Sequence, residues 1–390
     1  MAQLVPLISG EHNVLSLDIN RLYNYNLYEK SRWGLGLQYD IKLDGNRFST
    51  LSLSGYGAYG YADQRIKWGL KADLQSKLRH RTHTYVEFFH DLTPDGSRIL
   101  TNYQLSAFNS TGSFMTRHFS DTYRFTLGFS RQATANRTDG FELRLSRERY
   151  LHGIDTLIYP QSYSDLIKIR NIDFAEGRIL IAHTSGLRGE LLAGFMGGKE
   201  LSLRKLSDPH PEEYRIRPFF RLLMQYGHEF YFSAFEFDIF AQCGYADIHA
   251  PYSRLFDLGG TWSCPLLMER SLLTARPNEF TANCFGFINL KLSTQEPLFR
   301  LHNEILAIGT APTPFLLCDA AWGILPENSP LTAPDKGIAE VGAGIDGLLV
   351  WGAVKWGGAV VYRLTPESAV YHFSDPKDNL TILLTAQLNL

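Results

Sequence analysis

The sequence contains no long apolar run of the kind that crosses a membrane as a helix. Such a helix needs about 18–20 consecutive apolar residues. The most apolar stretch, Gly347–Leu364, is interrupted by glycines and by Lys355, and we interpret it as two strands. A bundle of transmembrane helices is therefore excluded, although 44% of the 390 residues are hydrophobic and 13% are aromatic.

An excess of charge of one sign is also lacking. Lys and Arg total 38 and Asp and Glu total 40, which gives a formal net charge of -2. A general nucleic-acid-binding protein needs a basic surface to neutralise phosphates. We therefore expect no nucleic-acid partner.

Motifs with a known chemistry are missing as well. The 12 histidines include no H-E-x-x-H arrangement, and the chain has no G-x-S-x-G sequence. The four cysteines form no C-x-x-C pair, so no zinc site is indicated. We expect no catalytic residues, no metal and no cofactor. The sequence leaves open whether the thiols are free or form a disulfide: Cys243, Cys264, Cys284 and Cys318.

What the sequence does contain is an alternation of apolar and polar residues from end to end. In one example, Phe141, Leu143 and Leu145 alternate with Glu142 and Arg144. Successive side chains of a strand point to opposite faces, so each such segment predicts a strand with one apolar and one polar face. The same pattern occurs in 15–20, 35–43, 66–75, 123–130, 339–346 and 380–390.

The length of these segments distinguishes between two kinds of all-β protein. Many have about 9–13 residues, whereas strands of soluble proteins usually have about 5–6. A tilted strand needs about 9–11 residues to cross a bilayer. We therefore predict a transmembrane antiparallel β-barrel of about 16 strands (roughly 14 to 18), forming one domain over residues 1–390 in a Gram-negative outer membrane. A soluble all-β protein is the structural alternative.

Connections between the predicted strands fall into two classes, as expected for short periplasmic turns and long surface loops. The short class comprises 44–46, 62–64, 227–228, 293–296 and 347–352. The long class comprises 198–213, 244–276, 309–336 and 365–378.

Charged residues on the polar faces are the candidate functional residues. Arg215, Arg217 and Arg221 alternate with apolar residues in the stretch from Tyr214 to Tyr226. An arginine in the lipid-facing middle of a barrel strand costs about 2–4 kcal/mol, so these side chains must face the lumen. Three lumenal arginines could favour anionic solutes or hold an internal plug; the alternative is a structural ion-pair network. The other predicted lumenal charges are Glu142, Arg144, Glu236, Asp238, Glu340 and Asp346.

Several stretches resemble a known family. They are NLYEKSRWGLGLQYD and LSLSGYGAYGYADQRIKWGL within 26–70, RPNEFTANCFGFINLKLS at 276–293, and the segment 336–364. In this order they are similar to the outer-membrane barrel of uncharacterised Bacteroidetes proteins, which commonly follows a carboxypeptidase-regulatory-like domain. Two features depart from that family: Ala282-Asn283 stands where Ser-Asp is expected, and the chain ends on Leu390 instead of an aromatic residue.

The resemblance implies an outer-membrane barrel but supplies no catalytic residues. The first ten residues lack the features of a secretory signal, so we expect this chain to be part of a longer precursor with a signal peptide and an upstream periplasmic domain. We predict a non-enzymatic barrel that acts in transport or in an envelope assembly. Its expected partners are outer-membrane lipid and other envelope proteins, the latter bound through surface loops or the upstream periplasmic domain. Two alternatives remain: a plugged scaffold or adhesion barrel acting through loops 244–276 and 309–336, and an outer-membrane enzyme with a lumenal site.

Overall fold

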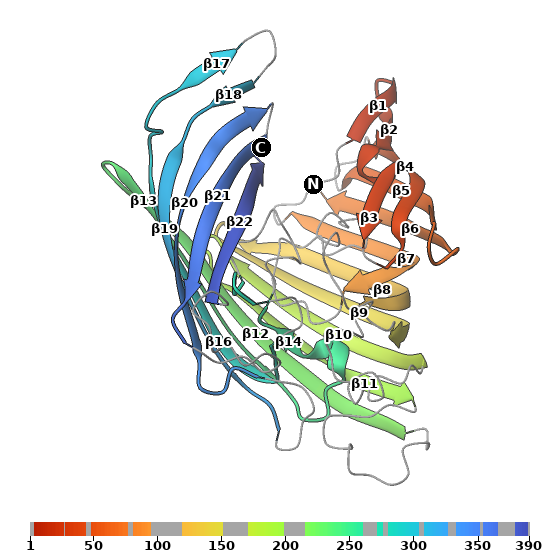
Figure 1. Ribbon diagram of the computed structural model, residues 1–390. Coiled ribbons are helices and arrows are strands. Elements are labelled where there is room, and N and C mark those ends of the chain that lie inside the picture. The colour runs from red at the N-terminus through yellow and green to blue at the C-terminus, as the bar shows by residue number, and fades with distance from the viewer. Residues whose placement is uncertain are drawn as a thin grey trace. The chain divides into compact units, whose positions relative to one another are not determined.

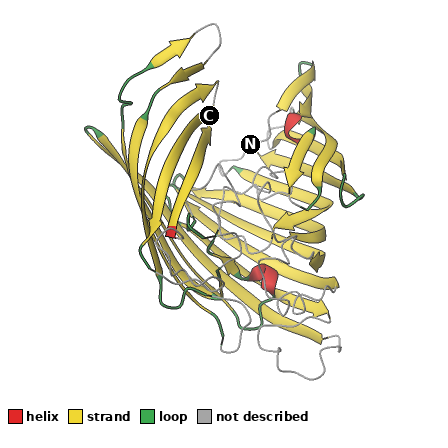
Figure 2. Cartoon of the chain, in the orientation of Figure 1, coloured by secondary structure: helices red, strands yellow, loops and turns green. Residues whose placement is uncertain are grey.

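The alternating segments form long antiparallel strands throughout the described chain (Figures 1 and 2). The computed structural model describes residues 4–26, 28–43, 48–76, 81–94, 119–150, 171–198, 215–259, 271–275, 280–303, 308–326, 333–351, 354–365 and 379–388. These residues form two compact units. Unit 1 contains the described residues up to Met224 together with Ala246–Leu255, and unit 2 contains Gln225–Tyr245 and the described residues from Phe256 onward.

In unit 1 each long strand pairs with the next along the chain. The strands are β1 (Leu4–Ser9), β2 (Asn13–Asp18), β3 (Tyr23–Asn26), β4 (Lys30–Lys42), β5 (Phe48–Gly60), β6 (Ile66–Ser76), β7 (Thr82–Pro94), β8 (Phe119–Thr134), β9 (Arg137–Tyr150), β10 (Asn171–His183) and β11 (Arg188–Gly198). Pairing runs from β1 to β2, from β2 to β4, and then in chain order to β11. A short 3-10 helix, η1 (Ile19–Arg21), leads into β3, which pairs with the first residues of β4.

Unit 2 repeats this antiparallel arrangement. Its strands are β13 (Phe235–Ala246), β14 (Phe256–Asp257), β15 (Thr281–Ala282), β16 (Cys284–Thr294), β17 (Leu301–Asn303), β18 (Ile308–Thr310), β19 (Thr313–Ile324), β20 (Ile338–Trp351), β21 (Val354–Arg363) and β22 (Leu380–Leu388). The long strands pair in the order β13, β16, β19, β20, β21 and β22. The remaining long strand, β12 (Arg215–Phe232), contains the boundary between the units.

Strand length agrees with the sequence prediction. Fifteen of the described strands have 9 to 18 residues, namely β4 to β13, β16 and β19 to β22. The large sheet has 20 described strands, because the short strands β1, β2, β3, β17 and β18 also belong to it.

Three predicted connections are wrong. Strand β12 continues through Gly227 and His228, and the turn lies at Ser233–Ala234. The predicted loop 309–336 contains the twelve-residue strand β19. The turn predicted at 347–352 starts too early, because β20 continues to Trp351, which pairs with Val354. Gly347, with a φ of 72°, lies at a bulge between Ile345 and Leu349.

On these strands the apolar side chains are exposed and the charged side chains are buried, which is the reverse of a soluble protein. On β9, Phe141, Leu143 and Leu145 are 44%, 45% and 56% exposed, whereas Glu142 and Glu148 are 3% and 1% exposed. Water-soluble proteins bury aliphatic side chains and almost never fully bury a charged side chain unless it is paired. An apolar outer face opposite a charged inner face is the arrangement of a transmembrane β-barrel. On the described strands these apolar side chains stay exposed instead of packing against a second sheet, as on the lipid-facing side of a barrel.

Aromatic side chains of the charged face lie over glycines on neighbouring strands. A β-carbon at Gly128 would meet the ring of Tyr85, and one at Gly69 would meet the ring of Tyr56. Glycine inside a strand commonly marks such a close approach. Among the residues that the structure describes, no helix has the length and apolar character needed to cross a membrane.

Candidate functional site

Ion pairs cover the charged face of unit 1. At its centre Glu142 accepts a hydrogen bond from Tyr85 Oη at 2.6 Å, lies 3.2 Å from Arg178 Nη1 and also pairs with Arg144. Arg178 pairs in turn with Glu190 of β11. All of these side chains are buried except that of Arg144, which is half-buried. Charges from three strands, β9, β10 and β11, therefore neutralise one another on this face.

Two of the three arginines predicted on β12 have described side chains, and both lie on the charged face. Arg221 is buried, and its Nε lies 3.8 Å from Glu190 Oε1, so it extends the same network. Arg217 is half-buried on the same face. Arg215 begins the strand, but its side chain lies outside the described part of the structure.

The connection between β13 and β16 spans residues 247–283. Its described parts, 247–259, 271–275 and 280–283, lie against the charged faces of the two units, and we call these parts the covering segment. Residues 247–276 were predicted as part of a surface loop, 244–276. In unit 1 the covering segment contributes the short 3-10 helix η4 (Tyr252–Arg254), whose last residue reaches two glutamates. Arg254 Nη2 and Nη1 donate to the two oxygens of Glu148 at 2.8 and 3.1 Å. Its Nε and Nη2 donate to the two oxygens of Glu176 at 2.6 and 3.1 Å.

The surroundings of Arg254 complete this site. Its guanidinium carbon lies 4.4 Å from the ring centroid of Phe174, and Ser253 Oγ also donates to Glu148, at 3.3 Å. Burial opposes a positive charge here, but the carboxylates of Glu148 and Glu176 outweigh it and raise the pKa of Arg254 well above its usual value. The side chain therefore stays charged, and the covering segment is attached to β9 and β10 by a charge-assisted clamp.

In unit 2 the covering segment is held by Glu340, which is fully buried on β20. Its carboxylate accepts hydrogen bonds from the backbone N–H groups of Leu273 and Thr274, the latter at 3.1 Å, and from Thr274 Oγ1. Arg363 of β21 donates to Thr274 Oγ1 and to its carbonyl oxygen, both at 2.8 Å. Leu273 packs in an apolar cluster with residues of β19 and β21.

The other predicted acids of unit 2 lie on the strands themselves. Asp346 Oδ2 is 3.2 Å from Lys291 Nζ of β16. Asp238 is half-buried on β13, opposite Lys291 in the β-ladder, and Glu236 is half-buried two residues earlier.

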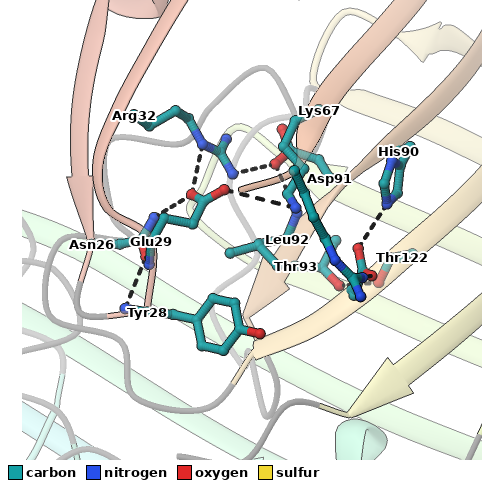
Figure 3. A network of polar contacts seen from close by, with 12 residues as sticks. Asn26, Tyr28, Glu29, Arg32, Lys67, His90, Asp91, Leu92, Thr93 and Thr122 are labelled. Atoms are coloured by element: carbon teal, nitrogen blue, oxygen red, sulfur yellow. Dashed lines mark hydrogen bonds and ion pairs between the residues drawn. The ribbon is translucent and has the colours of Figure 1, made fainter. Parts of the chain in front are cut away.

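A further polar network lies where η1, β3 and the turn before β4 cover the charged face of unit 1 (Figure 3). Glu29 is fully buried, and its Oε2 accepts from Arg32 Nε at 2.7 Å and from Asn26 Nδ2 at 2.6 Å. Arg32 Nη2 also donates to Asp91 Oδ1 at 2.6 Å. Lys67, likewise fully buried, lies 3.9 Å from Glu29 Oε1. The network fixes the N-terminal part of unit 1 to β4, β6 and β7.

Asp121 on β8 contacts three basic side chains next to this network. Its Oδ1 lies 2.8 Å from His90 Nε2, and its Oδ2 lies 2.5 Å from Arg65 Nη1 and 3.9 Å from Arg149 Nη2. His90, which is labelled in Figure 3, belongs to β7 and makes this contact through its ring nitrogen.

No group of three or more metal-ligating side chains occurs among the described residues. The three cysteines within that part of the chain, Cys243, Cys284 and Cys318, have free thiols. Cys264 lies outside the described residues.

The sequence pattern could have identified some site residues that were not predicted. Glu148 continues the alternation begun by Glu142 and Arg144, and Glu176 and Arg178 alternate with apolar residues of β10 in the same way. Arg254 carries no such signal, because it lies in a connection without periodicity.

Comparison with known proteins agrees with this architecture. BamA from Haemophilus ducreyi, solved without POTRA domains 1–3, is similar with a TM-score of 0.50 and 6% identity, over 99% of this chain and 75% of that one. The fold is that of an outer-membrane β-barrel. Its exposed apolar face and buried charges place the chain in the outer membrane of a Gram-negative bacterium.

Two other solved structures are also similar to this chain. CdiB from Escherichia coli has a TM-score of 0.48 and 13% identity over 99% of this chain and 67% of that one. CdiB from Acinetobacter baumannii has a TM-score of 0.44 and 9% identity, and this chain spans 65% of its length. No protein-family model and no curated protein sequence matches the chain.

Proposed function

We propose that this chain is a non-enzymatic outer-membrane barrel for transport or envelope assembly, and that its own covering segment closes the lumen at rest. The observation that carries the proposal is the clamp of Arg254 on Glu148 and Glu176. The charged face of a barrel sheet borders the lumen, so a segment bound to that face occupies lumenal space. Opening then requires the segment to leave.

The chemistry of the two attachments suits a closed resting state that can be released. Arg254 replaces water around two buried carboxylates, and removal of one partner of such a pair leaves the other charge uncompensated. Glu340 accepts hydrogen bonds from the backbone N–H groups of Leu273 and Thr274. This part of the attachment depends little on which side chains the covering segment carries. Both attachments join a connection to strands of the sheet, and polar contacts of this kind can be replaced by contacts with water if the segment leaves.

Conductance in planar lipid bilayers tests the proposal. We expect the wild-type protein to show low conductance and Arg254→Ala to show frequent or larger openings. Arg137→Ala is the matched control, because Arg137 pairs with Asp139 at an exposed strand end. A wild-type channel that is fully open, or an Arg254→Ala channel as closed as the wild type, would rule out closure by this segment.

A permanently plugged scaffold is the second candidate, favoured by the number of attachments of the covering segment. Less of the two predicted loops is free to act than expected, because described residues of 244–276 are bound to the charged faces and 309–336 contains β19. A scaffold would give flat conductance traces in every variant and would recover other envelope proteins in pull-downs from outer membranes.

We also propose that the chain belongs to the Bacteroidetes barrel family it resembles, with a carboxypeptidase-regulatory-like domain upstream on the periplasmic side. That domain would supply the contact with envelope partners. Intact-mass measurement of the native protein from outer membranes tests this, since a mature chain no longer than 390 residues would contradict it.

A further inference from the structure

The contacts of Arg254 define a binding site whose walls belong to the barrel and whose occupant belongs to the covering segment. Glu148 and Glu176 come from neighbouring strands β9 and β10, and both are at least nine-tenths buried, at 1% and 3% exposure. Phe174, 4% exposed, lies under the guanidinium, and its ring packs edge-on against Phe219 of β12 at 6.1 Å. The strands thus supply two carboxylates and an aromatic face, which we call the guanidinium cage.

We propose that the guanidinium cage is a recognition site for an arginine side chain of a polypeptide that the barrel handles, and that Arg254 occupies it as a tethered competitor. This inference rests on the proposed function: it names the class of ligand that displaces the covering segment. An incoming arginine takes over the four hydrogen bonds of Arg254, and the segment is then released.

The shape of the cage selects a guanidinium group over other cations. Each carboxylate accepts two N–H groups from the same plane, which matches the rigid fork of arginine. An ammonium group has three donors around a single point and cannot contact both carboxylates in this paired geometry. Stacking on an aromatic face also favours arginine. An anion is excluded by the two negative charges.

The contacts around the cage favour a polypeptide over a small cation. Ser253 Oγ donates to Glu148 next to Arg254, and the Arg254 N–H donates to the Pro251 carbonyl in a turn. Leu255 and Ala250, on either side of the turn, are fully buried. The site therefore accommodates a short turn of chain with an arginine at its end, and a ligand of the same form can make the same contacts.

Exchange between the two arginines depends on effective concentration. A side chain tethered within the same chain typically competes at an effective concentration of about millimolar. A free arginine derivative should thus bind far more weakly to the wild type than to a protein without Arg254. A polypeptide delivered at the lumen can overcome this competition through its additional contacts.

Calorimetric titration of the full chain in detergent micelles tests the cage directly. The probes are N-acetyl-arginine amide and, as the matched cation, N-acetyl-lysine amide. We expect Arg254→Ala to bind the arginine probe at least tenfold more tightly than the wild type does, and at least tenfold more tightly than it binds the lysine probe. Adding Glu176→Gln to Arg254→Ala should abolish binding. Equal binding of both probes, or binding of neither by a folded Arg254→Ala protein, would overturn the inference.

A second measurement on the wild type keeps the test decisive if Arg254→Ala does not fold. Hydrogen exchange of residues 253–255 should speed up with rising arginine probe and stay constant with the lysine probe; no change with either would also overturn the inference. The proposed function fails separately. If conductance never changes with Arg254→Ala but the arginine probe binds, the cage stands without gating. If conductance rises but no probe binds, gating stands without the cage.

Discussion

Arg254 and Glu148 are separated by 106 positions of sequence, yet both oxygens of the carboxylate accept hydrogen bonds from the same guanidinium, at 2.8 and 3.1 Å. Glu148 lies on strand β9, where strand pairing fixes its position. Arg254 lies in the connection between β13 and β16, where no strand pairing fixes it. A long connection pays a large entropic penalty when it is ordered, so this pair must contribute to holding it in place.

The energy of this pair can be measured by a double-mutant cycle. We expect Arg254→Ala and Glu148→Ala each to lower the free energy of unfolding by up to about 3–5 kcal/mol, because each removes a main counter-charge of a buried group, although Arg254 keeps Glu176 and Glu148 keeps Arg124. The double variant should lose much less than the sum. Urea unfolding in liposomes gives the coupling energy, with Arg137 and Asp139 as the exposed control pair, expected at about 0.2–1 kcal/mol. Additive losses at Arg254 and Glu148 would show that the pair does not hold the segment.

The attachment in unit 2 predicts a local effect. Glu340→Gln leaves one acceptor oxygen where the carboxylate has two and removes the negative charge, so hydrogen bonds from Leu273 and Thr274 should weaken. We expect hydrogen exchange of these two backbone N–H groups to become at least tenfold faster. Glu296→Gln, at an exposed position after β16, serves as control and should leave the exchange unchanged. Equal protection in both variants would contradict the role of Glu340.

Close packing between Tyr85 and Gly128 predicts opposite outcomes for two alanine substitutions. A β-carbon at Gly128 meets the Tyr85 ring, whose hydroxyl donates to Glu142. We expect Gly128→Ala to lower the free energy of unfolding by about 1–3 kcal/mol. At Gly57 nothing lies within 4 Å of an added β-carbon, so Gly57→Ala should be neutral or stabilise by up to about 1 kcal/mol. The same urea titration compares them, and equal effects would argue against the ring position.

The N-terminal network of Figure 3 depends on the charge of Asp91. Its carboxylate accepts from Arg32 at 2.6 Å and from Tyr56 Oη at 2.5 Å, and lies 3.9 Å from Arg21. Asp91→Asn keeps the shape but removes the charge, and should lower the free energy of unfolding by about 1.5–3 kcal/mol. Asp139→Asn, at an exposed pair, should change it by no more than about 0.5 kcal/mol. Similar melting temperatures for the two variants would contradict a structural role for the network.

The sequence was sufficient to predict the strands and their two faces because period-two alternation depends only on the local backbone. It predicted the environment of Glu142 and Arg144 for the same reason. Gly227 and Gly347 were wrongly interpreted as turns. Glycine also occurs inside strands and at bulges, and only the pairing with the neighbouring strand distinguishes these cases. Strand β19 was missed because Pro312 just before it and Pro314 near its start are typical of a loop.

The clamp on the covering segment could not be predicted from the sequence. Arg254 contacts strands more than 70 positions away, at Glu148 and Glu176, and no local pattern encodes that contact. Glu340 was predicted as a lumenal charge, but its partners are backbone N–H groups, which every residue carries. Long-range contacts of loops depend on how the chain closes in three dimensions, so they appear only in the structure.

The apolar strand faces contact lipid and the charged faces border the lumen. The most direct test of this arrangement is to place a nitroxide label at each position from 141 to 148 in turn, in a background without native cysteines, and to reconstitute the protein in liposomes. Electron paramagnetic resonance should show collisions with oxygen dissolved in the lipid at Phe141, Leu143 and Leu145, and none of this lipid contact at Glu142, Arg144 and Ser146. Equal accessibility of both sets to a water-soluble nickel chelate would contradict the account.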